Sequence, residues 1–394
     1  MCGSADVVKV LDFGKMPLAN AFLKDPKQPE AKYPLRVYFC RDCTSVQLLD
    51  IVDPAEVYTH YDYLTSASKP LADHFTNMGN DLCDEFITSN GELMVEIGGN
   101  DGVLLDAVKN RCRVLNIDPS EQASKISREK NIPTVTAFFN SKLAGQFRHL
   151  NNNAKVVVAN NVMAHIPDIR DVLEGVKNLL VEDGVFVFEV HWLGNLITTG
   201  GFDQIYHEHI YYHSLTALKR LVESVGLKVF NVELVPIHGE SLRVFVARTG
   251  PIYPHKAHAF MDREQQMGLN KEETYTNFSD KIARNKRNLV ELCRMLRREK
   301  KSIVGYGAPA KGNTLLNYYQ LPLDYLTDTT PLKQGLYSPG MHIKVSPPER
   351  LLKDPPDYAL LLAWNYADAI LAKEKHLMDL GTKFIIPVPT VQIA

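Results

Sequence analysis

The chain has 394 residues, with 44 lysine and arginine residues against 46 aspartate and glutamate residues and a formal net charge of −2. This length exceeds one ordinary core and predicts two or three units, each with its own buried apolar interior. The balanced charge excludes an overall basic field, so we expect neither a nucleic-acid nor a membrane partner.

The first twenty residues contain no basic region followed by an apolar core, and no stretch approaches the roughly 18 apolar residues of a membrane span. We therefore expect a cytoplasmic protein. Six cysteines without an export signal argue for reduced thiols or metal ligands and against a disulfide framework. A monomer is the working expectation for the oligomeric state.

The N-terminal part is rich in proline, which interrupts helices. A small irregular module of this kind usually needs a metal ion or a cross-link to stabilise its fold. Cys40 and Cys43, in YFCRDCTSVQ, form a C-x2-C turn after a short β-like run. Such a turn is the usual half of a structural zinc site, which four thiolates normally close. Only Cys2 is available on the other side, so three alternatives stay open: another group completes the site, the sequence begins after the missing ligand, or the turn is a reduced loop. We predict a zinc-binding-like module over residues 1–70, with Cys2, Cys40 and Cys43 as the metal ligands.

From residue 92 onward, apolar β-like runs such as ELMVEIG, RVLNID and KVVVANN alternate with helical patterns. This alternation predicts a parallel sheet with helices on both faces. We expect a central α/β domain over residues 71–255, ending in an antiparallel strand at 241–249. A charged segment, 256–300, predicts a long solvated linking helix, and the alternation restarts in a smaller α/β domain at 301–394.

Two stretches repeat one pattern of strand, glycine turn, helix and second strand. They are MVEIGGNDGVLLDAV and SIVGYGAPAKGNTLLNY, followed by Asp118 and Asp328 respectively at the end of the next strand. Glycines let a ligand approach the backbone at the start of a helix, and the acid can accept hydrogen bonds from ribose hydroxyls. A glycine turn that serves only helix packing is the alternative.

The first turn carries acidic and amide side chains where a dinucleotide site needs small residues. Glu96 precedes the Gly98–Gly99 pair, and Asn100 and Asp101 occupy the turn. Carboxylates repel phosphate and suit a cation such as the sulfonium end of S-adenosylmethionine. The pattern favours a methyltransferase, with a nicotinamide-dependent oxidoreductase as the alternative.

The second turn is basic instead. Lys311 lies in GAPAKGN and Lys333 in DTTPLKQGLYSPG. A positive, glycine-lined helix start suits a phosphate group. A pair of solvated lysines is the alternative interpretation.

Two further segments follow neighbouring strands of the central sheet. Asn160, Asn161 and His165 lie in VVVANNVMAHIPD, and FDQIYHEHIYYHS follows the strand GVFVFEV. Ligands bind beyond the carboxyl ends of parallel strands, so we expect both segments to face one cleft. His165 as a helix cap is the alternative to a site residue.

The segment 202–214, FDQIYHEHIYYHS, is called the catalytic loop below. A metal site is disfavoured, because a zinc protease motif needs H-E-x-x-H and Ile210 follows His209. A histidine beside a glutamate that can orient it, with a tyrosine that can donate to a developing oxyanion, can instead remove a proton next to a carbonyl. A hydrogen-bonded polar loop remains the structural alternative.

Taken together, the C…FCRDC pair, DFGKMPLANAFL, VEIGGNDGVLL, NNVMAHIPD, YHEH and VGYGAPAKGNTLL with DTTPLKQGLYSPG resemble the nucleotide-sugar C-methyltransferases that act on keto-sugars in deoxysugar pathways. The resemblance covers the whole chain in order. It implies an α/β protein with a small N-terminal zinc-ribbon-like module, a central Rossmann-like methyltransferase domain and a smaller Rossmann-like C-terminal domain that helps to hold the nucleotide-sugar.

The resemblance also implies roles for single residues. His209 resembles the family's general base, supported by Tyr206, Glu208 and His165. The acceptor implied is C-3 of a 4-keto sugar linked to a nucleotide, and the zinc implied is structural, although the first zinc cysteine of the family pattern is absent. The resemblance places Glu96, Gly98, Asn100 and Asp118 at S-adenosylmethionine and Tyr63 at the substrate. The full set predicted for the cofactor is Glu96, Gly98, Asn100, Asp101, Gly102, Asp118 and Asn160. The set predicted for the substrate is Tyr63 together with Lys311 and Lys333 of the basic turn. A subunit that binds the keto-sugar without methylating it is a third functional class, which the intact YHEH disfavours.

Overall fold

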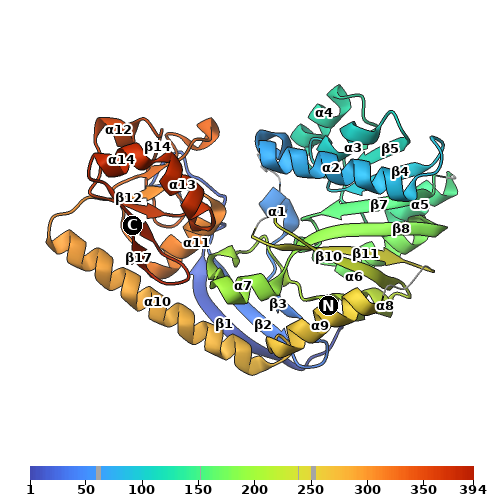
Figure 1. The fold of residues 1–394 in the computed structure, drawn as a ribbon, viewed down its shortest axis with the longest axis horizontal. Coiled ribbons are helices and arrows are strands. Elements are labelled where there is room, and N and C mark those ends of the chain that lie inside the picture. Colours follow the sequence, from blue (N-terminus) through green and yellow to red (C-terminus); the bar gives the residue numbers. More distant parts are fainter. Residues whose placement is uncertain (59–63, 151, 238, 250–253) are drawn as a thin grey trace.

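The computed structural model describes residues 1–58, 64–150, 152–237, 239–249 and 254–394. Its named strands form three sheets, of four, seven and six strands. Figure 1 shows two α/β units side by side, with the N-terminal sheet below and between them. The predicted fold class, α/β with a small N-terminal module, is confirmed.

The N-terminal sheet is antiparallel and is completed by a distant segment. Its first three strands are β1 (Val7–Met16), β2 (Tyr33–Cys40) and β3 (Val46–Leu48). The fourth, β9 (Tyr211–Tyr212), belongs to the catalytic loop and pairs with β3 through Val46 and Gln47. The N-terminal module therefore shares its sheet with the catalytic loop.

The central sheet is parallel except at one edge. Its strand order is β10-β11-β8-β7-β4-β5-β6, and the antiparallel pairs β8–β11 and β10–β11 lie at one end, as the short connection between β10 and β11 predicts. Separate apolar cores cover its two faces. The strands are β4 (Leu93–Ile97), β5 (Arg113–Ile117), β6 (Thr134–Val135), β7 (Ala154–Asn160), β8 (Leu180–His191), β10 (Lys228–Val235) and β11 (Ser241–Ala247).

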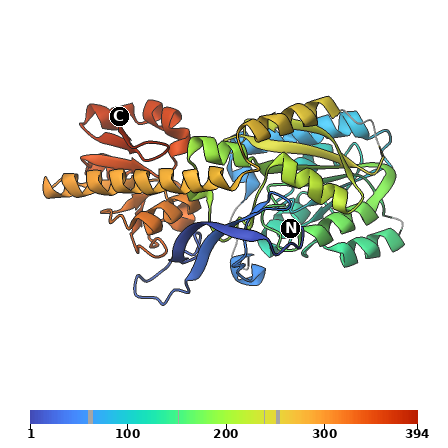
Figure 2. The same cartoon turned by 90° about the horizontal axis from the view of Figure 1, so that it is seen from below.

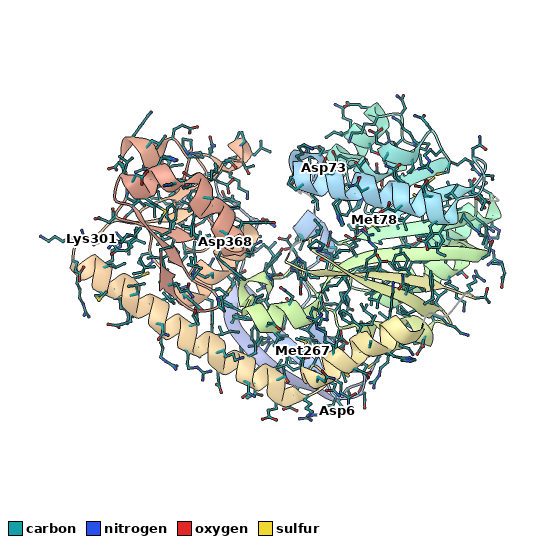
Figure 3. All side chains as sticks on the ribbon, in the orientation of Figure 1. Asp6, Asp73, Met78, Met267, Lys301 and Asp368 are labelled. Atoms are coloured by element: carbon teal, nitrogen blue, oxygen red, sulfur yellow. The ribbon has the colours of Figure 1, made fainter. Side chains whose placement is uncertain are left out.

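Helices cover both faces of this sheet. In Figure 3, Met78 marks the sheet-facing side of α2 (Lys69–Phe86), where it is buried, and Asp73 marks the outer side. The remaining helices up to residue 224 are α1 (Pro54–Tyr58), η1 (Thr65–Ala67), α3 (Val103–Val108), α4 (Glu121–Glu129), α5 (Ser141–His149), α6 (Ile169–Leu179), α7 (Leu193–Thr199), η2 (Phe202–Gln204) and α8 (Leu215–Ser224).

The segment that we expected to form one linking helix contains two, α9 (Pro254–Gln266) and α10 (Glu272–Arg298). Gly268, with φ of +72°, lies between them, and such a left-handed glycine commonly ends a helix. Figure 1 shows α9 beneath the central domain, and Figures 1 and 2 show α10 running along the C-terminal unit. One face of α10 is buried throughout its length.

The C-terminal sheet has the order β14-β13-β12-β15-β16-β17, and only the β16–β17 pair is antiparallel. Its strands are β12 (Ile303–Tyr306), β13 (Leu326–Thr327), β14 (Val345–Ser346), β15 (Tyr358–Leu361), β16 (Lys383–Ile386) and β17 (Gln392–Ile393). Its helices are α11 (Ala310–Tyr319), η3 (Pro331–Lys333), α12 (Arg350–Lys353), η4 (Trp364–Tyr366), α13 (Ala367–Lys373) and α14 (Lys375–Asp379).

One apolar core joins the N-terminal sheet to the C-terminal unit. It contains Leu11 and Phe13 of β1, Phe202 at the start of the catalytic loop, and Tyr319 and Leu326 of the C-terminal unit. Continuous burial of this kind fixes the loop against both units, because protein cores pack densely. Within the described residues, no helix is long and apolar enough to cross a membrane.

Candidate active site

The catalytic loop lies beyond the carboxyl ends of β7 and β8, which are parallel neighbours. The segment after β7 holds it by backbone hydrogen bonds: Ala164 O accepts from Ile210 N at 2.8 Å and from Tyr211 N at 3.2 Å. The Tyr211 hydroxyl donates to Pro167 O at 2.8 Å. The two segments that the sequence places at one sheet edge therefore meet there.

His209 is oriented by the backbone of its own loop. Its Nδ1 lies 2.8 Å from the carbonyl oxygen of Gln204. A carbonyl only accepts, so Nδ1 carries the proton of the neutral ring and Nε2 holds the lone pair. This is the tautomer that a base acting through Nε2 requires.

Aromatic rings surround His209. The centroid of the Tyr206 ring lies 4.1 Å away, that of His165 5.0 Å away, and that of His191 6.2 Å away. Of these, the sequence predicted Tyr206 and His165. His191, the last residue of β8, was missed, although its place at a strand end was the available signal.

His165 is held neutral by its surroundings. Desolvation lowers its pKa to about 4, with smaller contributions from the neighbouring His191 and His213. The helix-cap alternative is not what the structure shows, because Asp168 accepts from Asp171 N at the start of α6. His165 instead contributes an uncharged ring to the cluster.

Glu208 does not hold His209 at Nδ1, contrary to the expectation that a neighbouring glutamate orients the histidine. Its two carboxylate oxygens accept from Asn20 Nδ2 at 2.8 and 3.0 Å. Burial raises the pKa of Glu208 to about 7, and the Asn20 hydrogen bond opposes that rise. Glu208 thus ties the catalytic loop to the N-terminal module.

The remaining polar residues of the loop have structural contacts. His207 Nε2 lies 3.2 Å from Tyr33 O of the N-terminal sheet, and burial lowers its pKa. His213 is buried and stacks on Tyr211 with ring centroids 5.9 Å apart. His207 and Tyr211 therefore tie the loop to the N-terminal sheet and to the segment after β7.

The first glycine turn is held closed by the acid of the next strand. Asp118 accepts from Asn100 N at 2.9 Å and from Ser120 N at 2.8 Å. Asn100 and Gly98 both have positive φ, of +51° and +66°. A Cβ at Gly98 would lie 2.5 Å from a methyl carbon of Val162, so only glycine fits.

Glu96 and Asn160 place unpaired polar atoms beside this turn. Within the described part of the chain, Glu96 Oε2 and both side-chain polar atoms of Asn160 are buried without a hydrogen-bond partner. Burial raises the pKa of Glu96 to about 8, the nearby charges of Asp118 and Asp101 add to the rise, and the neighbouring Asn160 side chain opposes it. A polar or cationic ligand would satisfy these atoms.

Asp101 and Gly102 line the inner side of the turn. Asp101 is fully buried, and its carboxylate lies 3.3 Å from Lys130 Nζ, which also donates to the Asp101 carbonyl at 2.7 Å. Gly102 has φ of +76°, and a Cβ there would lie 2.7 Å from Ile132 Cδ1. Both residues therefore shape the turn, and the Asp101 charge is already paired.

The second glycine turn repeats the arrangement of the first. Ala308 N donates to Asp328 Oδ2 at 2.8 Å, and Gly307 has φ of +87°. Lys333 Nζ donates to Ala308 O at 2.9 Å and lies 4.0 Å from Asp328. Burial lowers the pKa of Lys333.

Lys311 lies at the start of α11 and is not a solvated surface lysine. Its Nζ donates to Asn365 Oδ1 and lies 4.5 Å from the centroid of the Trp364 ring. Burial lowers its pKa, and the charge of Asp203 opposes that shift. Tyr63, the third expected substrate residue, lies outside the described residues.

A buried ion cluster that the sequence did not reveal lies on β8. Glu189 is fully buried, 2.9 Å from His74 Nε2 of α2 and 2.8 Å from Arg243 of β11. No local pattern links these three residues, because they come from separate elements. Their pairing satisfies a carboxylate in the strand that leads to the catalytic loop.

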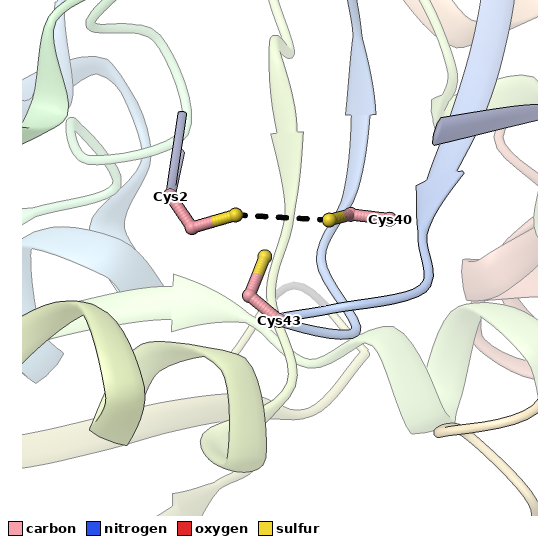
Figure 4. A group of neighbouring side chains, drawn as sticks. All are labelled: Cys2, Cys40 and Cys43. Atoms are coloured by element: carbon pink, nitrogen blue, oxygen red, sulfur yellow. Dashed lines mark hydrogen bonds between the residues drawn. The ribbon is translucent and has the colours of Figure 1, made fainter. Parts of the chain in front are cut away.

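The three predicted metal ligands converge. The sulfur atoms of Cys2, Cys40 and Cys43 all lie within 4.8 Å of one another, and Figure 4 shows them pointing together. The Cys2 and Cys40 sulfurs are 3.7 Å apart. Two thiolates on one tetrahedral zinc, at bonds of about 2.3 Å, would lie about 3.8 Å apart, so the geometry fits three ligands of a structural zinc site.

The arrangement of a central α/β sheet, an acidic glycine turn and a histidine cluster at the strand ends defines a methyltransferase with an N-terminal cysteine module. Comparison with known families agrees over most of the chain. The family models described as "Putative zinc binding domain", "Methyltransferase domain" and "C-methyltransferase C-terminal domain" match residues 1–58, 81–232 and 236–389 respectively.

The C-methyltransferase NovU of Streptomyces niveus is 36% identical over 402 aligned residues, which span 100% of this chain and 96% of NovU. The chain therefore belongs to the S-adenosylmethionine-dependent C-methyltransferase family. This membership decides against the oxidoreductase alternative.

Solved structures give weaker likenesses. A magnesium protoporphyrin IX methyltransferase from Synechocystis, with bound S-adenosylmethionine, has a TM-score of 0.35 and 14% identity, covering 45% of this chain and 79% of its own. An S-adenosylmethionine-dependent methyltransferase from Clostridium acetobutylicum has a TM-score of 0.35 and 12% identity, covering 50% of this chain and 96% of its own.

The zinc site predicts the metal content of the purified protein. We expect about one zinc ion per chain by elemental mass spectrometry, and Cys40→Ser should lose most of it, because serine is a poor zinc ligand. Cys293→Ser, at a buried cysteine of α10 outside the cluster, should keep the metal. Equal zinc in both variants would contradict the assignment.

The first glycine turn predicts a selective loss of cofactor binding. Gly98→Ala should weaken S-adenosylmethionine binding by about tenfold or more, because a left-handed alanine costs roughly 1–2 kcal/mol before any clash with Val162. Isothermal titration calorimetry measures this. Gly145→Ala, where an added Cβ meets no atom within 4 Å, is the matched control and should bind as the wild type does.

Because the pKa of Glu208 is raised in the folded state, we expect the free energy of unfolding to depend on pH. The pKa of Glu208 in the folded state, about 7, lies above its ordinary value of 4.5, so folding favours the protonated form. The stabilisation is complete below about pH 4.5 and is lost as the pH rises through 7, by up to about 3 kcal/mol.

Urea unfolding between pH 4.5 and 8 measures this effect. The free energy of unfolding of Glu208→Gln should fall less over this range than that of the wild type. Glu182→Gln, at an exposed glutamate, is the control and should follow the wild type. Parallel curves for Glu208→Gln and the wild type would contradict the expectation.

Proposed function

We propose that this enzyme methylates a sugar carbon, C-3, next to the 4-keto group of a nucleotide-linked deoxysugar. The observation that carries the proposal is the hydrogen bond from His209 Nδ1 to Gln204 O, which leaves the lone pair on Nε2 at the end of β8. A neutral imidazole in that orientation can remove a proton next to a ketone.

The proposed step breaks one C–H bond of the substrate. The proton passes to His209 Nε2, and the electron pair moves toward the carbonyl oxygen to give an enolate. S-adenosylmethionine, when bound, would supply an electrophilic methyl group to the resulting nucleophilic carbon, with S-adenosylhomocysteine as the leaving group. His209 then carries the proton as an imidazolium.

Tyr206 and His165 support this step through their places beside His209. The Tyr206 ring lies 4.1 Å from the His209 ring, where its hydroxyl is our candidate donor to the developing oxyanion. The low pKa of His165, about 4, keeps a second positive charge away from the imidazolium. Glu208 contributes by fixing the loop through Asn20.

The residues proposed to hold the cofactor surround the first glycine turn. The unpaired atoms of Glu96 and Asn160 are suited to the charged amino-acid end, and the close turn at Gly98 lets it approach the backbone. Asn100, Asp101, Gly102 and Asp118 give the turn its shape.

We propose that the C-terminal unit holds the nucleotide part of the substrate. Lys311 and Lys333 both lie at its glycine turn and have pKa values lowered by burial. Desolvation of this kind strengthens the attraction between a lysine and a phosphate group. Tyr63 remains a candidate contact to the sugar by resemblance alone.

Proton exchange tests the proposed base without methyl transfer. In deuterated water, the wild type should incorporate deuterium at the carbon next to the ketone of a nucleotide-linked 4-keto sugar. His209→Asn should slow this by about 10²–10⁴-fold, the usual contribution of a general base.

His207→Asn, two positions away in the same loop, is the matched control and should retain exchange. Mass spectrometry of the recovered sugar gives the rates. Exchange at the wild-type rate in His209→Asn would show that another group is the base.

A further inference from the structure

A buried hydrogen bond joins the C-terminal unit to the catalytic loop. Asp203, in η2, is fully buried, and its Oδ2 accepts from Trp364 Nε1 at 2.6 Å. Trp364 lies in η4, just after β15 of the C-terminal unit. The bond spans 161 positions of the sequence, so it links two separate domains.

The next residue of the loop makes the bond that orients His209. Gln204 follows Asp203 directly, and its carbonyl accepts from His209 Nδ1 at 2.8 Å. Adjacent residues share a planar peptide unit, so fixing the Asp203 side chain restricts the position of the Gln204 backbone. Two consecutive hydrogen bonds therefore lead from Trp364 to His209.

Ring stacking restrains the other side of η2. Phe202 is almost fully buried and stacks on Tyr319 of α11, with centroids 5.2 Å apart and an interplanar angle of 19°. The Tyr319 hydroxyl donates to Asn285 of α10 at 2.8 Å. The C-terminal unit thus also packs against Phe202, the residue before Asp203.

Burying the Asp203 carboxylate costs desolvation free energy, which a purely structural contact would not require. Within the described residues, Asp203 Oδ1 is buried without a hydrogen-bond partner. Replacing both partners of a buried polar pair with apolar groups of similar volume is often neutral or stabilising. The desolvation cost of Asp203 is explained if its hydrogen bond to Trp364 positions the catalytic loop.

We infer that Asp203 and Trp364 are positioning residues, through which the C-terminal unit sets the orientation and the tautomer of His209. This inference rests on the proposed role of His209 as the base. Because Lys311 lies over the same Trp364 ring, one of the two lysines proposed to hold the nucleotide is in contact with the group that positions the base.

Histidine tautomers test this inference without substrate. Protein labelled with ¹⁵N-histidine should show His209 protonated at Nδ1, with the signal assigned by its loss in His209→Asn. Trp364→Phe removes the donor and keeps an aromatic ring, and Asp203→Ala removes the acceptor. In both variants, we expect His209 to lose the single Nδ1–H tautomer.

Two control variants distinguish loss of the Asp203–Trp364 hydrogen bond from other effects of the substitutions. Asp203→Asn keeps an oxygen that can accept from Trp364 and should preserve the tautomer. Trp192→Phe removes the other indole N–H that donates to a buried carboxylate, Glu264 at 2.9 Å, and should leave His209 unchanged. Asp203→Asn behaving like Asp203→Ala would assign the effect to charge and overturn the inference.

Kinetics supply the second readout. In Trp364→Phe and Asp203→Ala, kcat for methyl transfer should fall by about tenfold or more, since a misplaced base loses part of its contribution, while the dissociation constant of S-adenosylmethionine stays the same. A wild-type tautomer in both variants would overturn the inference, even if their melting temperatures fall. Should Trp364→Phe not fold, Asp203→Ala tests the same bond.

The two proposals fail in different ways. Absence of proton exchange in the wild type would reject the proposed function, whereas the tautomer spectra need no reaction. Unchanged tautomers together with normal exchange would reject only the positioning role.

Discussion

The hydrogen bond between His209 Nδ1 and the Gln204 carbonyl is the contact on which the proposed chemistry depends. All three parts of the chain help to hold the loop that makes it. The N-terminal module pairs β3 with β9 and binds Glu208 through Asn20, and the central domain holds the loop at Ala164. The C-terminal unit contacts Asp203 through Trp364. All three domains therefore contact this one loop and restrain it.

Burial gives the titratable groups of the site their charge states. It lowers the pKa of His165 to about 4 and raises the pKa values of Glu208 and Glu96 to about 7 and 8. The environment beside His209 is thus poor in fixed charge, and electrostatic interactions there are stronger than in water. With its raised pKa, Glu96 is mostly protonated near pH 7, and a positive charge bound at the first glycine turn, such as that of the methyl donor of this family, would favour its carboxylate form.

The sequence was sufficient for the fold class and for the residues at strand ends, because strand periodicity and glycine turns are local signals. Glu96 and Gly98 were identified as candidates in this way, and His209 through the family resemblance. Asn20, Trp364 and Gln204 were not, because the first two reach the loop only through tertiary packing and the third acts through its backbone carbonyl, which its side chain does not reveal. The role expected of Glu208 at His209 was wrong for the same reason, since neighbouring positions in a loop need not face each other. The break between α9 and α10 depended on the backbone at Gly268.

We propose that His209, in the loop restrained by all three domains, enables methylation of a carbon next to a ketone. The most direct test incubates the purified enzyme with S-adenosylmethionine carrying a ¹³C-methyl group and a panel of nucleotide-linked 4-keto deoxysugars, and locates the label by NMR. The account predicts one new methyl group on the carbon next to the ketone, C-3, of at least one sugar. A methyl group found on oxygen or nitrogen, or no transfer to any sugar of the panel, would contradict it.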